Sequence, residues 1–391
     1  MLGKIETRKV NIRDVDFRMI LYVLALSVIG ILVVHSATAN EKTNSVVSTT
    51  VKQVIGVAGG LVLMTVIMFI DYHRLTKYSW IFYLLAIAGL LYVLFFTRSI
   101  SGAKRWIHIP MFGTIQPSEF AKPALLVFLA FLIYKLGDKL KKFYGILLYL
   151  VLASPVLILV LLEPDLSTAI VVSVMIFTVL FLAGLEYKWL LILGAIIVPV
   201  IVVFLIAVYQ PGQEILNSIL KPHQVERING YFFPENYPQI IYQQDKSVMA
   251  IGSGGLFGKG LNNSSLESVK YGSFLSEEQC DFIFAIVGEE LGFFGSLLVI
   301  LLLSLTVFCC FRIASSCTDV VGKVIAGTVG VSIATQSFIN IGVATLILPN
   351  TGIPLPFISA GLSSLLGTYM MIGLVLNVGL YGRLKRRVFF G

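Results

Sequence analysis

Long apolar stretches, separated by short polar connections, dominate the chain from its first twenty residues to its last. A helix that crosses a hydrocarbon core of about 30 Å needs about 20 mostly apolar residues. Ten stretches of the 391-residue chain approach or exceed this length: residues 17–37, 54–70, 80–96, 120–134, 144–162, 166–185, 189–209, 282–311, 324–348 and 355–380. The pattern predicts an all-α, polytopic membrane protein of about ten transmembrane helices, in a single domain over residues 1–391.

Composition supports a membrane protein and excludes nucleic-acid binding. Hydrophobic residues make up 57% of the chain and charged residues 13%, more apolar surface than a soluble domain of this size can bury. The net charge is +8, but the basic residues fall between apolar stretches and form no patch with interleaved aromatics. They are typical of loop anchors at a membrane surface.

The distribution of lysine and arginine predicts the orientation. With the N-terminus inside, the inner connections and termini carry eighteen of these residues. The short outer segments carry five: Lys42, Lys52, Arg98, Lys104 and Arg105. Because cytoplasmic loops are enriched in lysine and arginine, we expect both termini in the cytoplasm.

One connection is much longer than the others. Residues 210–281, between the seventh and eighth predicted helices, form an extracellular loop that includes the glycine-rich run 252–260. Within it, Ile240, Gln244 and Val248 recur at helical spacing, which predicts an interfacial or re-entrant helix. Long loops in compact proteins are usually functional or disordered, and the many apolar residues here favour function.

Charged residues at the start of the fourth predicted helix form the first candidate site. Glu119 and Lys122 are three residues apart and share a helix face, and Arg105 precedes them in the outer loop. One interpretation is a purely structural ion pair beside an interfacial Trp106. The other is a cationic cluster that binds a phosphorylated lipid headgroup, since arginine suits bidentate contact with phosphate.

Two aspartates at outer helix ends form the second candidate site. Asp165, in the turn 163–165, either caps the sixth helix or also orients a base or holds a cation. Asp281 opens the eighth helix, either as an N-cap or as an acceptor of a substrate proton. Glu289 and Glu290 lie roughly 12–14 Å further along a straight helix, so we expect them inside the hydrocarbon region.

Several motifs together resemble the SEDS family of cell-wall polymerases, typified by RodA, FtsW and SpoVE. The similar segments follow the family order: GAKRWI and QPSEFAK within 102–122, EPDLSTAI at 163–170, AIGSGGLFGKGL at 250–261, DFIFAIVGEELG at 281–292 and FINIGVATLILPNTGIPLPFISAG at 338–361. Each is weak alone, but together they cover nearly the whole chain. Overall, the chain is most similar to the RodA members.

The resemblance implies a ten-helix peptidoglycan glycosyltransferase that polymerises lipid II at the outer leaflet. It assigns Asp281 as the general base of an inverting transfer that forms β-1,4 glycan strands and releases undecaprenyl pyrophosphate. It assigns Arg105, Glu119, Lys122 and Asp165 to substrate binding. A divalent cation such as Mg²⁺ is allowed, with Asp165 or Asp281 as candidate ligands.

The resemblance also implies partners and a cellular role. The partner expected is a class B penicillin-binding protein, which crosslinks the new strands. MreC, MreD and RodZ, or divisome proteins, are expected around it, with lipid II and undecaprenyl-linked glycan as membrane ligands. Elongation, division and sporulation all stay open as roles.

Two other functions are compatible with ten helices and a headgroup site. A lipid II flippase needs a polar path to the cytoplasmic side, whereas the charges here gather outside. A scaffold for the penicillin-binding protein leaves the clustered outer charges unexplained. The sequence therefore favours chemistry at one face.

Overall fold

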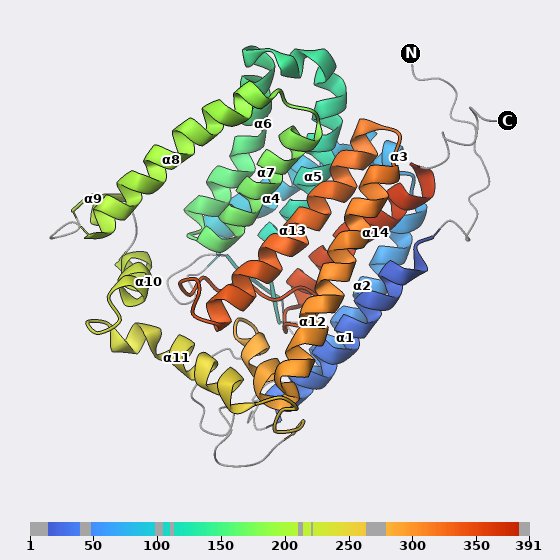
Figure 1. Ribbon diagram of the computed structural model, residues 1–391. Coiled ribbons are helices and arrows are strands. Elements are labelled where there is room, and N and C mark those ends of the chain that lie inside the picture. The colour runs from blue at the N-terminus through green and yellow to red at the C-terminus, as the bar shows by residue number, and fades with distance from the viewer. Residues whose placement is uncertain are drawn as a thin grey trace.

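The protein is a bundle of membrane-length helices with a group of shorter helices at one end (Figure 1). The computed structural model describes residues 15–39, 48–97, 105–109, 113–209, 214–219, 222–262 and 279–382. Its helices are α1 (Phe17–Ala37), α2 (Thr49–Phe69), α3 (Tyr72–Lys77), α4 (Ser79–Phe96), α5 (Pro117–Leu136), η2 (Gly137–Lys141), α6 (Phe143–Leu162), α7 (Leu166–Leu182), α8 (Tyr187–Tyr209), α9 (Glu214–Ile219), α10 (Pro222–Phe232), α11 (Pro238–Ser253), α12 (Ile283–Ser316), α13 (Val320–Ala344) and α14 (Leu362–Tyr381). A hairpin of β1 (Ile107–Ile109) and β2 (Gly113–Ile115) precedes α5.

All ten predicted transmembrane stretches are helices, and the all-α, polytopic fold is confirmed. Within the described residues, eight helices are long and apolar enough to cross a membrane; α7, with 17 residues, and α8, with 23, account for the other two predictions. The largest error is between α13 and α14, where 345–348 and 355–361, predicted as helix ends, belong to a longer loop over 345–361. Pro349, Pro354 and Pro356 interrupt helical hydrogen bonding there.

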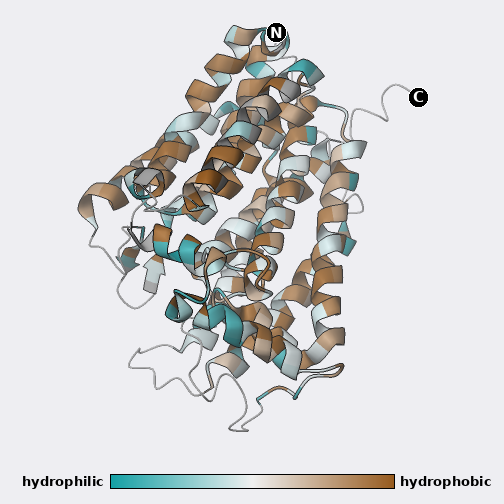
Figure 2. Cartoon of the chain, turned by 60° about the vertical axis from the view of Figure 1, so that its left-hand side comes forward, coloured by the Kyte–Doolittle hydropathy of each residue, from teal (hydrophilic) through white to brown (hydrophobic). Residues whose placement is uncertain are grey.

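The helices of the bundle approach closely where residues are small. A Cβ atom on Gly60 of α2 would lie 2.2 Å from the Tyr369 ring of α14, and one on Gly373 would lie 2.9 Å from the Met64 carbonyl oxygen. Small residues at such crossings let membrane helices pack backbone to backbone. Figure 2 shows hydrophobic residues along the bundle, with hydrophilic residues gathered among the shorter segments at the opposite end from the N-terminus.

Both ends of the described chain lie at the same end of the bundle. Asp16, which precedes α1, forms an ion pair with Arg312 near the end of α12. Thr318, just after α12, donates a hydrogen bond to the carbonyl oxygen of Gly382, just after α14 (3.2 Å). The lysine and arginine distribution assigns this end to the cytoplasm, in agreement with the sequence prediction.

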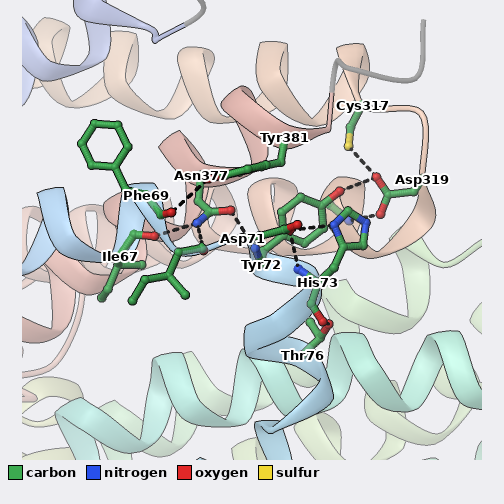
Figure 3. Close-up of polar contacts among 12 residues, drawn as sticks. Ile67, Phe69, Asp71, Tyr72, His73, Thr76, Cys317, Asp319, Asn377 and Tyr381 are labelled. Atoms are coloured by element: carbon green, nitrogen blue, oxygen red, sulfur yellow. Dashed lines mark hydrogen bonds and ion pairs between the residues drawn. The ribbon is translucent and has the colours of Figure 1, made fainter. Parts of the chain in front are cut away.

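A hydrogen-bonded network closes this cytoplasmic end (Figure 3). The Tyr72 hydroxyl, on α3, donates to Asp319 at the start of α13 (2.6 Å), and the Cys317 thiol lies 3.2 Å from the same carboxylate oxygen. Burial acts to raise the pKa of Asp319, but hydrogen bonds from Tyr72 and the Gly322 amide lower it overall. The carboxylate is therefore held ionised between three elements.

Asn377 of α14 joins the same network to α2. Its side-chain amide donates to the carbonyl oxygens of Ile67 (2.6 Å) and Ile70, and its side-chain oxygen accepts from the Tyr72 amide (2.9 Å). These are backbone groups freed where α2 ends, and a buried backbone group in a membrane protein needs an internal partner. Asn377 therefore holds the turn between α2 and α3 on the bundle.

The predicted helix in the long outer loop is confirmed as α11, although one residue of its predicted face is not buried. Gln244 is buried as its spacing suggests, together with Ser247, whereas Val248 is exposed. The Ser247 hydroxyl donates to the Ala344 carbonyl oxygen (2.7 Å), and the Gln244 amide donates to the Val343 and Leu348 carbonyl oxygens (3.0 and 2.8 Å). Polar contacts with the end of α13, rather than apolar spacing, orient the helix.

We expect Asn377→Ala to lower the melting temperature of the purified protein in detergent. The substitution leaves the buried Tyr72 amide and the Ile70 carbonyl oxygen without the Asn377 side chain as partner, at a cost of about 1–3 kcal/mol for each unsatisfied group. Thr65→Ala is the control, because Thr65 is exposed on α2 and bonds only to its own helix. Equal melting temperatures for the two variants would contradict this account of the network.

Candidate active site

Asp281 lies where the long outer loop enters α12, and the chain around it is tied to the loop 345–361. The Ser359 hydroxyl donates to the Cys280 carbonyl oxygen (2.6 Å), and the Ala360 amide donates to the Gln279 carbonyl oxygen (2.8 Å). The Asn340 side chain, from α13, donates to the Asp281 carbonyl oxygen (2.9 Å). Three successive backbone carbonyls are thus held by hydrogen bonds, which fixes the position of the backbone from which the Asp281 side chain extends.

The carboxylate of Asp281 lies against the backbone at Gly352. A Cβ atom at this position would be 3.1 Å from Asp281 Oδ2, and the glycine has a φ of +74°. Both the positive φ and the short approach favour glycine. Asn340 also donates to the Ile353 carbonyl oxygen (2.7 Å), so one amide holds both sides of this contact.

Asp165 is both an N-cap and the centre of a polar cluster, so the two sequence interpretations are compatible. Its carboxylate accepts the Thr168 amide and hydroxyl hydrogen bonds of α7, each at 3.0 Å. It also accepts a hydrogen bond from the Gln116 side chain, at the start of α5 (2.8 Å), and lies 3.7 Å from the Arg105 guanidinium. The segment before β1, the start of α5 and the start of α7 therefore meet at one buried carboxylate.

Glu119 and Lys122 lie in the interior of the bundle. Their side chains are 5% and 3% exposed and form an ion pair of 2.8 Å. A Cβ atom on Gly367 of α14 would lie 2.8 Å from the Glu119 carbonyl oxygen, so α14 packs directly on this turn. The pair stabilises the start of α5, which carries Gln116, and its predicted contact with substrate stays a prediction.

Arg227 of α10 is a site residue that the sequence did not single out. Desolvation and the nearby Arg105 lower the pKa of its guanidinium, while Asp281 and Asp165 act in the opposite direction. Its charge is therefore within electrostatic range of all three. Nothing in the local pattern distinguishes Arg227 from its charged neighbours in the loop, because only the fold of α10 brings it over the site.

The position of Glu289 and Glu290 corrects the expectation that they lie deep in the hydrocarbon region. The helix α12 breaks at Gly292, and the 24 residues that follow, about 36 Å at helical rise, are long enough to cross the membrane alone. Glu290 accepts a hydrogen bond from Ser36, the penultimate residue of α1. The two glutamates therefore lie level with the outer end of α1.

The profile of the cell cycle protein family that comprises FtsW, RodA and SpoVE matches residues 17–383. The chain belongs to this family. It is 32% identical over 378 residues to a probable peptidoglycan glycosyltransferase FtsW of Geobacter sulfurreducens (94% of this chain, 96% of the relative). It is 33% identical to the stage V sporulation protein E of Bacillus subtilis (94% and 98%).

Solved structures of the FtsW/RodA/SpoVE family share the fold. The Thermus thermophilus rod shape determining protein RodA is 26% identical, with a TM-score of 0.66 and coverage of 94% of this chain and 98% of that one. A chain from a peptidoglycan synthase complex that coordinates polymerization and crosslinking gives a TM-score of 0.74, at 26% identity and 93% and 97% coverage. The suspected family is therefore confirmed, while its elongation, division and sporulation branches are not separated.

The described residues do not form a resident metal site in this family member. They contain no group of three or more histidine, cysteine, aspartate or glutamate side chains that could hold a metal ion. The Asp165 carboxylate is already surrounded by hydrogen-bond donors from Gln116 and Thr168. The described residues therefore show no cation site of this kind, and a divalent ion such as Mg²⁺, with Asp165 or Asp281 as a ligand, stays a prediction.

Glu163, two residues before Asp165, is a buried acid that no described donor satisfies. Its residue is 0% exposed, and neither carboxylate oxygen has a hydrogen-bond partner. Burial, together with repulsion from Asp165, raises its pKa to about 8, although Arg105 acts to lower it. The side chain is therefore neutral at pH 7.

We expect Glu163→Gln to remove a pH dependence of stability. Because the folded-state pKa lies above the unfolded value, the folded protein loses stability as pH rises from about 4.5 to about 8. Glutamine resembles the neutral acid at every pH. The variant should melt a few degrees above the wild type at pH 9 and level with it at pH 5; a wild-type advantage at pH 9 would refute this assignment.

Proposed function

We propose that this protein is a peptidoglycan glycosyltransferase that polymerises lipid II at the outer leaflet of the bacterial membrane. The observation that carries the proposal is the meeting of Asp281 with two arginines, Arg105 and Arg227, at the outer end of the bundle. A general base beside two guanidinium groups suits glycosyl transfer from a pyrophosphate-linked donor. The names of the FtsW relatives agree with this activity.

In the proposed mechanism, Asp281 accepts the proton of the GlcNAc 4-hydroxyl of the acceptor lipid II. The oxygen attacks the anomeric carbon of the donor MurNAc from the face opposite its α-linked pyrophosphate. A β-1,4 bond forms with inversion, the anomeric carbon–oxygen bond breaks, and undecaprenyl pyrophosphate leaves with the bonding electron pair. The rigid support of the Asp281 backbone by Asn340 and Ser359 favours this role, because catalysis depends on accurate placement of the base.

The two arginines suit the leaving group. Negative charge grows on the pyrophosphate as the bond breaks, and guanidinium groups bind phosphate oxygens through paired donors. Two like charges held near each other, each within electrostatic range of Asp165, favour the binding of a dianionic ligand. The buried pair of Glu119 and Lys122 lies near the start of α5, just after Gln116, which donates a hydrogen bond to Asp165.

The flippase alternative is less compatible with this fold. Alternating access requires the cytoplasmic ends of the helices to separate, whereas α2, α3, α13 and α14 are joined there through Tyr72, Asp319 and Asn377 (Figure 3). The glutamates that could have lined a path, Glu289 and Glu290, lie at the outer end of the membrane span. Both observations favour chemistry at the outer face.

A class B penicillin-binding protein is the proposed partner. The structural relative in a complex that coordinates polymerization and crosslinking supports a crosslinking partner for this chain. MreC, MreD, RodZ and the divisome proteins stay predictions of the family resemblance.

We expect Asp281→Asn to lower polymerisation of lipid II by the purified protein in detergent at least a hundredfold, because general base catalysis typically contributes a factor of about 10²–10⁴. Glycan strands are resolved by gel after a fixed reaction time. Asp245→Asn, an exposed aspartate on α11, is the matched control and should leave the rate unchanged. A folded Asp281→Asn variant with near wild-type activity would remove Asp281 as the base.

Detergent leaves no membrane to cross, so glycan product from the wild type also excludes transport as the sole activity.

We expect Arg227→Ala to raise the KM for lipid II roughly tenfold or more, since a charge-assisted hydrogen bond is worth about 1.5–3 kcal/mol. Arg227→Lys keeps the charge but loses the paired donors, so its KM should fall between those of the wild type and the alanine variant. Initial rates over a lipid II series measure both. An unchanged KM in Arg227→Ala would show that Arg227 does not contact the substrate.

A further inference from the structure

The break in α12 is filled by the glycine-rich loop rather than by solvent. In an unbroken helix, the amides of Phe293 and Phe294 would donate to carbonyls four residues earlier. Gly292, with a φ of +68° and ψ of −161°, interrupts this pattern. The two amides donate instead to the carbonyl oxygens of Gly255 (2.9 Å) and Leu256 (3.2 Å).

The other half of the interrupted bonds is satisfied by the same loop. The Glu289 and Glu290 carbonyl oxygens, which an unbroken helix would have paired with those amides, accept the amides of Lys259 (2.9 Å) and Gly260 (3.0 Å). The loop thus replaces two helical hydrogen bonds by four bonds to itself. We call this junction of residues 254–262 with residues 288–294 the clamp.

Side chains hold the clamp together in addition to its backbone hydrogen bonds. Lys259 Nζ lies 2.9 Å from Glu289 Oε1, with the glutamate 1% exposed and the lysine 21% exposed. The Ser36 hydroxyl donates to the Glu290 carboxylate and accepts the Asn262 amide hydrogen bond (2.9 Å). An ion pair and a serine bridge therefore tie α1, the loop and α12 together.

The glycines of the run 252–260 allow this close contact between the loop and α12. A Cβ atom on Gly258, whose φ is +78°, would lie 2.1 Å from the Glu290 carbonyl oxygen, and one on Gly254 would lie 2.0 Å from the Gly288 carbonyl oxygen. No side chain fits at these distances. The run is a close-packed surface for the break in α12.

The clamp lies at one end of a short rigid element whose other end is Asp281. Between them, Ile283–Leu291 is helical, and all of its side chains except that of Leu291 are buried. Nine residues span roughly 13 Å. Since a packed helix of this length moves as a unit, the clamp and the hydrogen bonds at 279–281 together determine where the Asp281 carboxylate lies.

We propose that the clamp, through the Lys259–Glu289 pair, positions Asp281 for proton abstraction. Neither side chain touches the substrate, and both act through the helical segment 283–291. Loss of Lys259 leaves the buried Glu289 carboxylate without this ion pair, and loss of Glu289 removes the attachment of Lys259 and its loop. Displacement of a catalytic group by about 1 Å can cost up to a hundredfold in rate. This inference rests on the proposed function of Asp281.

The test is steady-state polymerisation of lipid II by purified full-length Lys259→Met and Glu289→Gln variants. We expect kcat to fall roughly tenfold or more in both, with the KM for lipid II within about twofold of the wild type, because the substrate contacts are intact. Lys259→Arg should restore most of the rate, since it restores the ion pair. Glu289→Gln keeps the shape of the side chain, so it decides the test if Lys259→Met does not fold.

Asp16→Asn is the matched control. It breaks the ion pair with Arg312, which joins the same helices α1 and α12 at the cytoplasmic end, and should leave kcat unchanged. A folded Glu289→Gln variant with wild-type kcat, no rescue by Lys259→Arg, or an equal loss in Asp16→Asn would each overturn the proposal. Asp281→Asn is assayed alongside: if it is inactive while the clamp variants are active, only the positioning role fails.

Discussion

Backbone groups that leave a helix inside a membrane protein need partners within the protein, because the hydrocarbon core supplies none. The outer half of this bundle contains a break in α12, a seventeen-residue loop between α13 and α14 and a tight turn between α6 and α7. At the break, the glycine-rich loop takes over the interrupted hydrogen bonds. In the loop between α13 and α14, the Asn340 side chain donates to the Ile353 carbonyl oxygen and the Ser359 hydroxyl accepts the Leu355 amide hydrogen bond. Together, these hydrogen bonds place Asp281 at the outer face.

The two ends of the bundle use polar groups differently. At the cytoplasmic end, Tyr72, Asp319 and Asn377 bond to one another and to freed backbone groups, and so hold helices together. At the outer end, groups of the same kind come close: the cations Arg105 and Arg227, and the carboxyl groups of Glu163 and Asp165, of which Glu163 is neutral at pH 7. Repulsion between the two arginines costs stability unless a ligand offsets it, which favours the outer end as the proposed reactive one.

The sequence predicted the fold well because its main signal, apolar length, is a local property. All ten membrane helices were located, and errors arose at ends where proline-rich segments such as 345–361 contain enough apolar residues to resemble helix. Asp281 and Asp165 could be selected because they sit at helix starts within recognisable motifs. Arg227 could not, since α10 has no distinctive pattern and only its packing brings the guanidinium over the site.

The sequence by itself determined the topology, the outward position of the charged residues and the membership of a polymerase family. These follow from residue order, because hydrophobic length and charge bias act through neighbouring positions. Only the tertiary structure decided that Glu119 and Lys122 are a buried pair, that Glu289 and Glu290 lie at the membrane boundary, and that the glycine run fits the break in α12. Each depends on which groups, far apart in the sequence, approach one another in the fold. Contacts between such groups produce no periodic pattern in the sequence.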